Sequence, residues 1–159
     1  MKIAFINSPL QDYGKIKIKE YYTTPPLGLG YLATIAKNEG CDVRLLDAEA
    51  SKLSPKEISE FVGFYKPHVV GINLTSPTFD LSRQIIEQLK VPKIMVGGAH
   101  ATINPKQTLT DIPKIDILAV GESESTLEEL IQNDFNPAGI NGIYYRQNKD
   151  IISNPNRKL

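Results

Sequence analysis

Short apolar runs alternate along this chain with longer stretches in which apolar residues recur every three or four positions. The short runs are typical of buried strands, and the longer stretches are typical of amphipathic helices. The runs that we interpret as strands cover residues 2–6, 43–46, 68–74, 93–96 and 116–120. A helical stretch follows each of them, so the pattern predicts five repeats of a strand and a helix.

Helix-capping patterns mark where two of these helices begin. Ser54 is followed by a proline and, three residues on, by Glu57. Ser125 and Glu128 have the same spacing ahead of the last helix. In a capping box, the serine side chain binds the backbone of the glutamate and the glutamate side chain binds the backbone of the serine. We therefore predict a capping box at both places.

The alternation of strands and helices predicts an α/β fold with a doubly wound parallel sheet. Strands that are apolar throughout indicate a sheet buried on both faces, and right-handed crossovers place helices on both sides. Five strands fit the flavodoxin-like (Rossmann-like) order 2-1-3-4-5 better than a six-stranded dinucleotide fold. Two apolar segments at 143–146 and 151–152 flank a polar turn, which predicts a C-terminal β-hairpin extension. We expect the α/β domain at residues 1–136, with the hairpin and the start of a linker at 137–159.

Composition excludes several classes of protein. The chain has 159 residues, the size of one domain, and its 18 Lys and Arg balance its 18 Asp and Glu. Because binding to phosphate backbones needs a cationic surplus, we expect no nucleic acid partner. The sequence has no apolar run near the roughly 20 residues that span a bilayer, and its N-terminus does not resemble a signal peptide. We therefore expect a cytoplasmic protein without a membrane partner.

The chain also lacks the familiar patterns of catalytic and metal sites. Cys41 is the single cysteine, so the chain has neither an internal disulfide nor a cysteine cluster for zinc or iron–sulfur. The two histidines, His68 and His100, do not have the spacing of metal ligands. The nucleophile elbow, the P-loop and the G-x-G-x-x-G motif are absent. We predict no catalytic residue and no metal ligand in this chain.

Loops at the carboxyl ends of the predicted strands are the best candidates for ligand binding. In open parallel sheets, ligands bind beyond these ends, where the strand order reverses. The loops are small, hydroxylated and glycine-rich, so a large planar ligand or its tail can approach the backbone closely. The candidate binding residues are Ser8, Thr75, Ser76, Pro77, Thr78, Gly97, Gly98, Ala99, His100, Gly121 and Glu122.

Five of these residues also have a structural interpretation. Gly97 and Gly98 are suited to a tight turn between a strand and a helix. Thr75 could satisfy backbone groups of its own loop, and His100 could cap the helix after it. Glu122 carries a favourable charge near the start of a helix. The sequence leaves both interpretations open at these positions.

Four segments carry a further pattern: PPLGLGYLA at 25–33, VGINLTSPT at 70–78, VGGAHAT at 96–102 and VGE at 120–122. In this order they resemble the N-terminal cobalamin-binding domain of the radical SAM enzymes of the methyltransferase and oxidative cyclase type. The closing hairpin and the sequence NPNR at 154–157 are similar to the stretch that leads into the radical SAM barrel of that family. The resemblance covers essentially the whole chain.

The resemblance implies that residues 1–136 hold cobalamin, with the corrin over the strand ends and the nucleotide tail beside the sheet. It implies that the partner is a C-terminal radical SAM domain of the same full-length protein, which would hold an iron–sulfur cluster and S-adenosylmethionine. Better-known cobalamin domains carry D-x-H-x-x-G, but Asp12 is followed here by Tyr13 and Gly14. A cobalamin with an open or water-bound lower face is therefore implied, in a module that is not itself catalytic.

Two other functions remain open. The chain could be a cofactor-free Rossmann-like domain that recognises a partner or positions a substrate, or, with less support, a flavin-binding electron-transfer domain. Bulky side chains filling the space beside strands one and three would favour the first of these. An open groove lined by Thr75, Ser76, Gly97 and Gly98 would count against it. A large residue in place of Gly98 is expected to block binding of cobalamin, provided that the backbone there accepts a side chain.

Overall fold

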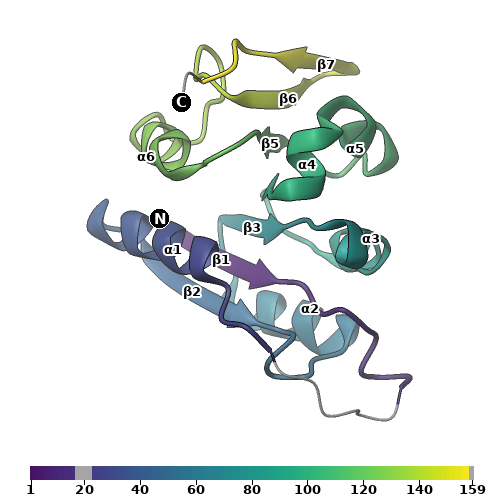
Figure 1. Ribbon diagram of the computed structural model, residues 1–159. Coiled ribbons are helices and arrows are strands. Elements are labelled where there is room, and N and C mark those ends of the chain that lie inside the picture. The colour runs from purple at the N-terminus through teal and green to yellow at the C-terminus, as the bar shows by residue number, and fades with distance from the viewer. Residues whose placement is uncertain (17–22, 158–159) are drawn as a thin grey trace.

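The computed structural model describes residues 1–16 and 23–157, which form one sheet with helices on both sides (Figure 1). Within these residues the sheet has seven strands in the order β2-β1-β3-β4-β5-β6-β7. The parallel strands are β1 (Lys2–Asn7), β2 (Asp42–Asp47), β3 (Val69–Asn73), β4 (Lys93–Gly97) and β5 (Ile117–Ala119). The hairpin strands β6 (Ile143–Gln147) and β7 (Asp150–Ser153) continue the sheet, with β6 antiparallel to β5. The predicted order 2-1-3-4-5 and the hairpin are confirmed, but the sheet has more strands than five because the hairpin joins it.

The helices cover the two faces of the sheet unequally. They are α1 (Leu27–Asn38), α2 (Pro55–Tyr65), α3 (Phe79–Gln88), α4 (Ala99–Ile103), α5 (Pro105–Asp111) and α6 (Glu124–Gln132). Figure 1 shows α1 and α6 on one side of the sheet and α2, α3, α4 and α5 on the other. Each side encloses its own hydrophobic core, as the right-handed crossovers predict.

Alternation along the central strands decides which side chain enters which core. In β1, Ile3 and Phe5 pack on the α1 and α6 side, whereas Ala4 and Ile6 pack on the opposite side. The central strands are buried on both faces, which explains why their sequences are apolar throughout. The edge strand β2 is an exception, because none of its residues is buried and Leu45 is 41% exposed.

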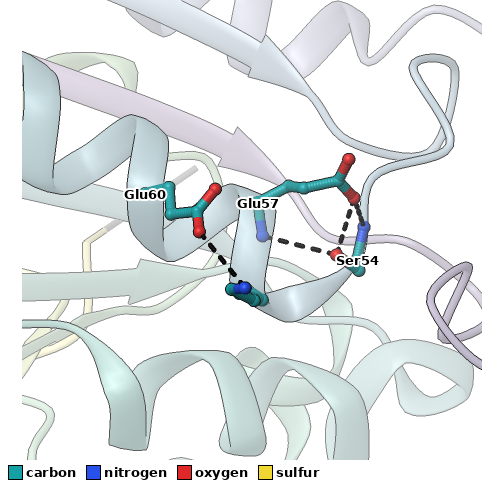
Figure 2. A network of polar contacts seen from close by, with 4 residues as sticks. Ser54, Glu57 and Glu60 are labelled. Carbon is teal, nitrogen blue, oxygen red and sulfur yellow. Dashed lines mark hydrogen bonds and ion pairs between the residues drawn. The ribbon is translucent and has the colours of Figure 1, made fainter.

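The capping box predicted at the start of α2 is confirmed. Figure 2 shows that the Glu57 backbone N–H donates to Ser54 Oγ over 3.3 Å, while the Ser54 N–H and hydroxyl donate to the Glu57 carboxylate over 2.8 and 2.6 Å. These bonds from Ser54 lower the pKa of Glu57. One turn on, Lys56 and Glu60 form an exposed ion pair of 3.7 Å.

The second predicted capping box is wrong. Helix α6 begins at Glu124 with Ser123 as its N-cap, and Ser123 makes no capping bond through its side chain. Ser125 therefore lies inside the helix, two residues after the N-cap position. The buried residues Leu127 and Leu130 fix the rotation of this helix against the core, and its start follows from that packing.

The C-terminal segment expected to be a linker is held against the domain up to residue 157. The side-chain amide of Asn154 donates to two backbone carbonyls of the 137–140 loop, both over 2.7 Å. Arg157 pairs with Glu129 of α6 at 2.9 Å. The segment therefore packs as part of this domain, and its role in leading to another domain stays a prediction.

Candidate ligand-binding cavity

A cavity of about 300 Å³ opens at the carboxyl ends of β1, β3 and β4, between the sheet and α1. This volume lies at the lower end of the range that is typical of sites for small molecules. The lining residues are Phe5, Pro26, Leu27, Gly28, Leu29, Leu32, Gly71, Ile72, Asn73, Met95, Val96, Gly97, Gly98, Gly121, Glu122, Ser123 and Glu124. The loop after β5 and the start of α6 close one side of it.

The cavity exists because small residues occupy neighbouring strands on the face toward α1 and α6. Gly71 and Gly97 lie on this face, and a Cβ at Gly97 would make only ordinary contacts with Ser123 and Ala119, at 3.6 Å and beyond. Gly71 is more restricted, because a Cβ there would lie 2.7 Å from the ring of Phe5. Side chains of ordinary size at these positions would occupy the space that is now open.

The lining changes from apolar to polar between the inner end and the mouth. Phe5, Leu29 and Met95 line the inner end and are 2, 7 and 5% exposed. The polar lining residues Asn73, Glu122, Ser123 and Glu124 are all partly or fully exposed. Such a site suits a ligand with an apolar inner part and polar groups that face solvent.

Four of the residues predicted from the sequence line this cavity: Gly97, Gly98, Gly121 and Glu122. Gly98 also has the structural role that the sequence left open. Its φ is +103°, and a Cβ would lie 2.2 Å from Asn73 Oδ1 and 2.7 Å from the carbonyl oxygen of Leu74. The backbone at Gly98 therefore does not accept a side chain, and a large residue there would disturb the fold as well as any ligand.

The threonines after β3 mainly satisfy their own loop. Ser76–Thr78 forms a 3₁₀ turn, and the hydroxyls of Thr75 and Thr78 are 3.0 Å apart. The Thr75 backbone N–H also donates to Thr78 Oγ1 over 3.2 Å, and Thr78 is buried. Neither threonine belongs to the cavity lining, so contact with a ligand at these positions stays a prediction.

His100 and its neighbours lie beside the cavity rather than in its lining. Its Nδ1 is 3.1 Å from Ser76 Oγ, and its ring lies 4.3 Å from that of Phe79, tilted by 31°. Pro77 and Ala99 are exposed nearby in the chain and also lie outside the lining. These contacts fix the imidazole ring at the carboxyl end of the sheet.

Ser8 is the remaining predicted site residue. It is 3% exposed at the end of β1, and its hydroxyl has no hydrogen-bonding partner among the described residues. It is not part of the cavity lining, so its assignment to the site also stays a prediction.

Several cavity residues lie within strands or on α1 and were not predicted from the sequence. Phe5, Asn73 and Met95 face the cavity from β1, β3 and β4, and the first two turns of α1 form its wall. The alternation of side chains along a strand places Phe5, Gly71 and Met95 on one face of the sheet. Gly28 and Gly30 leave one side of the otherwise apolar start of α1 without side chains. Both patterns are visible in the sequence, but only the strand register shows that they lie next to each other.

Two described groups with a shifted pKa lie away from the cavity. Burial, together with a hydrogen bond to the Asp42 carbonyl, raises the pKa of Tyr65 to about 12. Burial also raises the pKa of the Cys41 thiol. Within residues 1–16 and 23–157, no group of three or more His, Cys, Asp or Glu is arranged to hold a metal ion. In the same ranges, no helix is both long enough and apolar enough to cross a membrane.

The fold and the cavity together define a class, a doubly wound α/β domain with a cavity at the carboxyl ends of its strands, where ligands bind in such sheets. The family model of the B12 binding domain matches residues 15–131. The chain therefore belongs to the B12-binding domain family, which confirms the family expected from the sequence. Cobalamin is the cofactor that defines this family.

Relatives with curated descriptions are longer than this chain. An uncharacterised methyltransferase of Pyrococcus horikoshii is 32% identical over 169 residues, covering 100% of this chain and 36% of its own length. The anaerobic magnesium-protoporphyrin IX monomethyl ester cyclase of a Synechocystis species is 33% identical over 163 residues, covering 96% of this chain and 32% of its own. The chain thus spans about a third of the length of these relatives.

Solved structures of radical SAM enzymes share the fold. The methyltransferase TsrM of Kitasatospora setae, with cobalamin and a [4Fe-4S] cluster bound, matches 99% of this chain and 29% of its own with a TM-score of 0.79 and 20% identity. The cobalamin-dependent radical enzyme OxsB, with aqua-cobalamin and S-adenosylmethionine bound, matches 99% of this chain and 22% of its own with a TM-score of 0.75 and 19% identity. These matches confirm the predicted flavodoxin-like fold.

Proposed function

We propose that this chain binds cobalamin, with the nucleotide arm in the cavity beside β3 and β4 and the corrin over the strand ends. In this proposal it is a module of a longer radical SAM enzyme that performs methyl transfer or related radical chemistry. The C-terminal barrel of that enzyme holds the iron–sulfur cluster and S-adenosylmethionine. Membership of the B12-binding family and the open cavity at the strand ends support the proposal.

The residues of the cavity fit such a ligand. Gly97 leaves the sheet uncovered at the end of β4, so the arm of a ligand can lie close to the backbone there, whereas the Phe5 ring covers Gly71. The apolar inner end suits a flat aromatic base, and Asn73 and Ser123 at the mouth offer hydrogen bonds to polar groups of the arm. When bound, cobalamin supplies a cobalt centre that can accept and donate a methyl group.

A cobalt with an open or water-bound lower face is part of the proposal. In the loop after β1, Asp12 accepts from the Gly14 N–H and pairs with Lys15, while the Tyr13 hydroxyl donates to Glu49 over 2.8 Å. None of these side chains is an imidazole. The side chains of this loop bond to one another and to nearby residues, and none of them offers an imidazole nitrogen to a metal.

The two histidines of the chain lie at opposite ends of the sheet. His68 lies at the end away from the cavity, where its Nδ1 accepts from the Lys2 backbone N–H over 2.9 Å. His100 lies at the cavity end, where its Nδ1 is bonded to Ser76 and its ring packs on Phe79. The proposal that cobalamin is held through its arm rather than through its metal therefore rests on the loop after β1, which has no histidine.

An open cavity counts against a cofactor-free interaction domain. In that alternative, side chains would fill the space beside β1 and β3, as they do in an ordinary core. Instead, Gly97 and Gly98 line an opening of about 300 Å³. A binding measurement separates the two functions directly.

The test is binding of hydroxocobalamin by the purified chain, followed by gel filtration at tens of micromolar and by spectral titration. Two variants form a matched pair, because Gly28 and Gly30 both lie in α1 and neither has an atom within 4 Å of an added Cβ. Gly28 lines the cavity, whereas Gly30 does not. We expect Gly28→Leu to bind at least about tenfold more weakly, a loss of about 1.4 kcal/mol, and Gly30→Leu to bind as the wild type does.

Each outcome bears on the proposal. A wild-type chain that carries no pink species through gel filtration overturns it. Equal binding by both variants overturns the placement of the arm in the cavity. Both substitutions replace glycine in a helix, so their effects on helix propensity cancel in the comparison.

A further inference from the structure

We propose that the inner end of the cavity selects among corrinoids by the base on the nucleotide arm, preferring a benzimidazole base to a purine base. This inference rests on the proposed function and deepens it, because it names the class of corrinoid that the site takes. Corrinoids that carry a nucleotide arm share the corrin, the phosphate and the ribose, and they differ in the base that would reach the inner end.

The side chains at the inner end offer no hydrogen bonds. Phe5, Leu29 and Met95 belong to the core between the sheet, α1 and α6, and Leu32 packs against them. All four line the cavity, and the first three are almost completely buried. A methylated benzimidazole ring presents an apolar edge to such a surface, and its burial there is favourable.

The backbone of the sheet at the inner end is also already used. Gly71 of β3 pairs with Phe5 of β1 on one side and with Met95 of β4 on the other. Met95 pairs in turn with Ile117 of β5. The N–H and C=O groups of these central strands therefore bond one another in the sheet. They are not free to pair with the amine and ring nitrogens of a purine.

Polar partners are found only toward the mouth. Asn73, Ser123 and Glu124 are partly exposed, and Glu122 is exposed. The polar groups that all corrinoids share would meet these residues equally. A purine base would instead lose its bonds to water at the inner end without replacing them, which weakens binding. The difference in affinity should therefore follow the base alone.

The test compares three corrinoids with the wild-type chain by equilibrium dialysis. They are cobalamin with its dimethylbenzimidazole base, pseudocobalamin with adenine in that place, and cobinamide, which has no nucleotide arm. We expect cobalamin to bind about tenfold or more tightly than pseudocobalamin, and cobinamide to bind more weakly than cobalamin. Equal binding of cobalamin and pseudocobalamin, or tighter binding of pseudocobalamin, overturns the inference but leaves the proposed function standing. Binding of none of the three overturns both.

A matched pair of variants tests whether the inner end of the cavity determines the preference for the base. Leu32→Gln places an amide beside the inner end, and Gln is a good helix former. Leu45→Gln makes the same change on β2, where the side chain is 41% exposed and outside the cavity. We expect Leu32→Gln to reduce the ratio of the two affinities several-fold and Leu45→Gln to leave it unchanged.

An unchanged ratio in a folded Leu32→Gln variant contradicts a selective inner end and overturns the inference. Thermal unfolding of both variants checks that they are folded. If Leu32→Gln does not fold, the wild-type comparison of cobalamin with pseudocobalamin decides the matter by itself.

Discussion

Replacing Gly71 with alanine is expected to destabilise the domain through its contact with Phe5. An alanine Cβ would lie 2.7 Å from Cδ1 and 2.9 Å from Cε1 of the ring, closer than unstrained carbon atoms approach. Phe5 is 2% exposed, and the ring must move to relieve the overlap. Overpacking of this kind typically costs about 1–3 kcal/mol. The lower unfolded-state entropy of alanine offsets part of that cost, about 0.5–1 kcal/mol.

A double-mutant cycle isolates the contact. Phe5→Val removes both of the overlapping ring atoms, and alone it should cost somewhat less than the roughly 3–5 kcal/mol of a Phe→Ala change. In the Phe5→Val, Gly71→Ala double variant the overlap is gone, so the alanine should then cost little. We expect a favourable coupling energy of about 1 kcal/mol or more between the two positions.

Urea unfolding followed by circular dichroism gives the four free energies that the cycle needs. Gly63→Ala is the control, because Gly63 lies in α2 with open space around it, and alanine should stabilise that helix by up to about 1 kcal/mol. A coupling energy near zero would show that the Phe5 ring moves away from an alanine at position 71 without cost. In that case the close approach of Phe5 to Gly71 would not determine the shape of the inner end of the cavity.

Three further substitutions test local interactions. Ser54→Ala removes the capping box of α2 and should cost about 1 kcal/mol in urea unfolding; no loss of stability would argue against the cap. Tyr65→Phe removes the hydrogen bond to the Asp42 carbonyl and should cost about 0.5–1.5 kcal/mol at neutral pH. Folding raises the Tyr65 pKa from 10.0 to about 12, so this tyrosine stabilises the fold fully below pH 10. We expect the wild type to lose stability relative to Tyr65→Phe as the pH rises from 10 to 12. Parallel profiles of stability against pH for the two proteins would contradict the raised pKa. Arg157→Met should lower the melting temperature slightly by removing the bond to Glu129, and an unchanged melting temperature in low salt would show that this contact contributes nothing.

The strand order could be predicted because five repeats of a strand and a helix fit the flavodoxin-like order of such sheets. Apolar runs separated by helical stretches predict parallel strands with right-handed crossovers. The capping box at Ser54 is equally local, since the two partners are three residues apart. The same reasoning failed at Ser125, because packing of the buried side of α6 moved the helix start to Glu124.

The candidate site was predicted only in part. The cavity lies at the strand-end loops, and Gly97 and Glu122 line it, while binding of a ligand there stays a prediction. The hydroxyls after β3, however, bond within their own loop, and no local pattern distinguishes a threonine that binds a ligand from one that binds its neighbour. Asn73 was overlooked because it is the last residue of a strand rather than part of a loop.

The amino-acid sequence alone determined the fold class, the order of the parallel strands and the family, because each depends on residue types and short spacings along the chain. The tertiary structure decided where the cavity lies and what lines it. Gly71 and Gly97 belong to different strands, and only the register of β3 with β4 places both on the face toward α1. An empty volume is a property of side chains that are brought together from distant positions, so its size and its apolar inner end follow from packing rather than from any single motif.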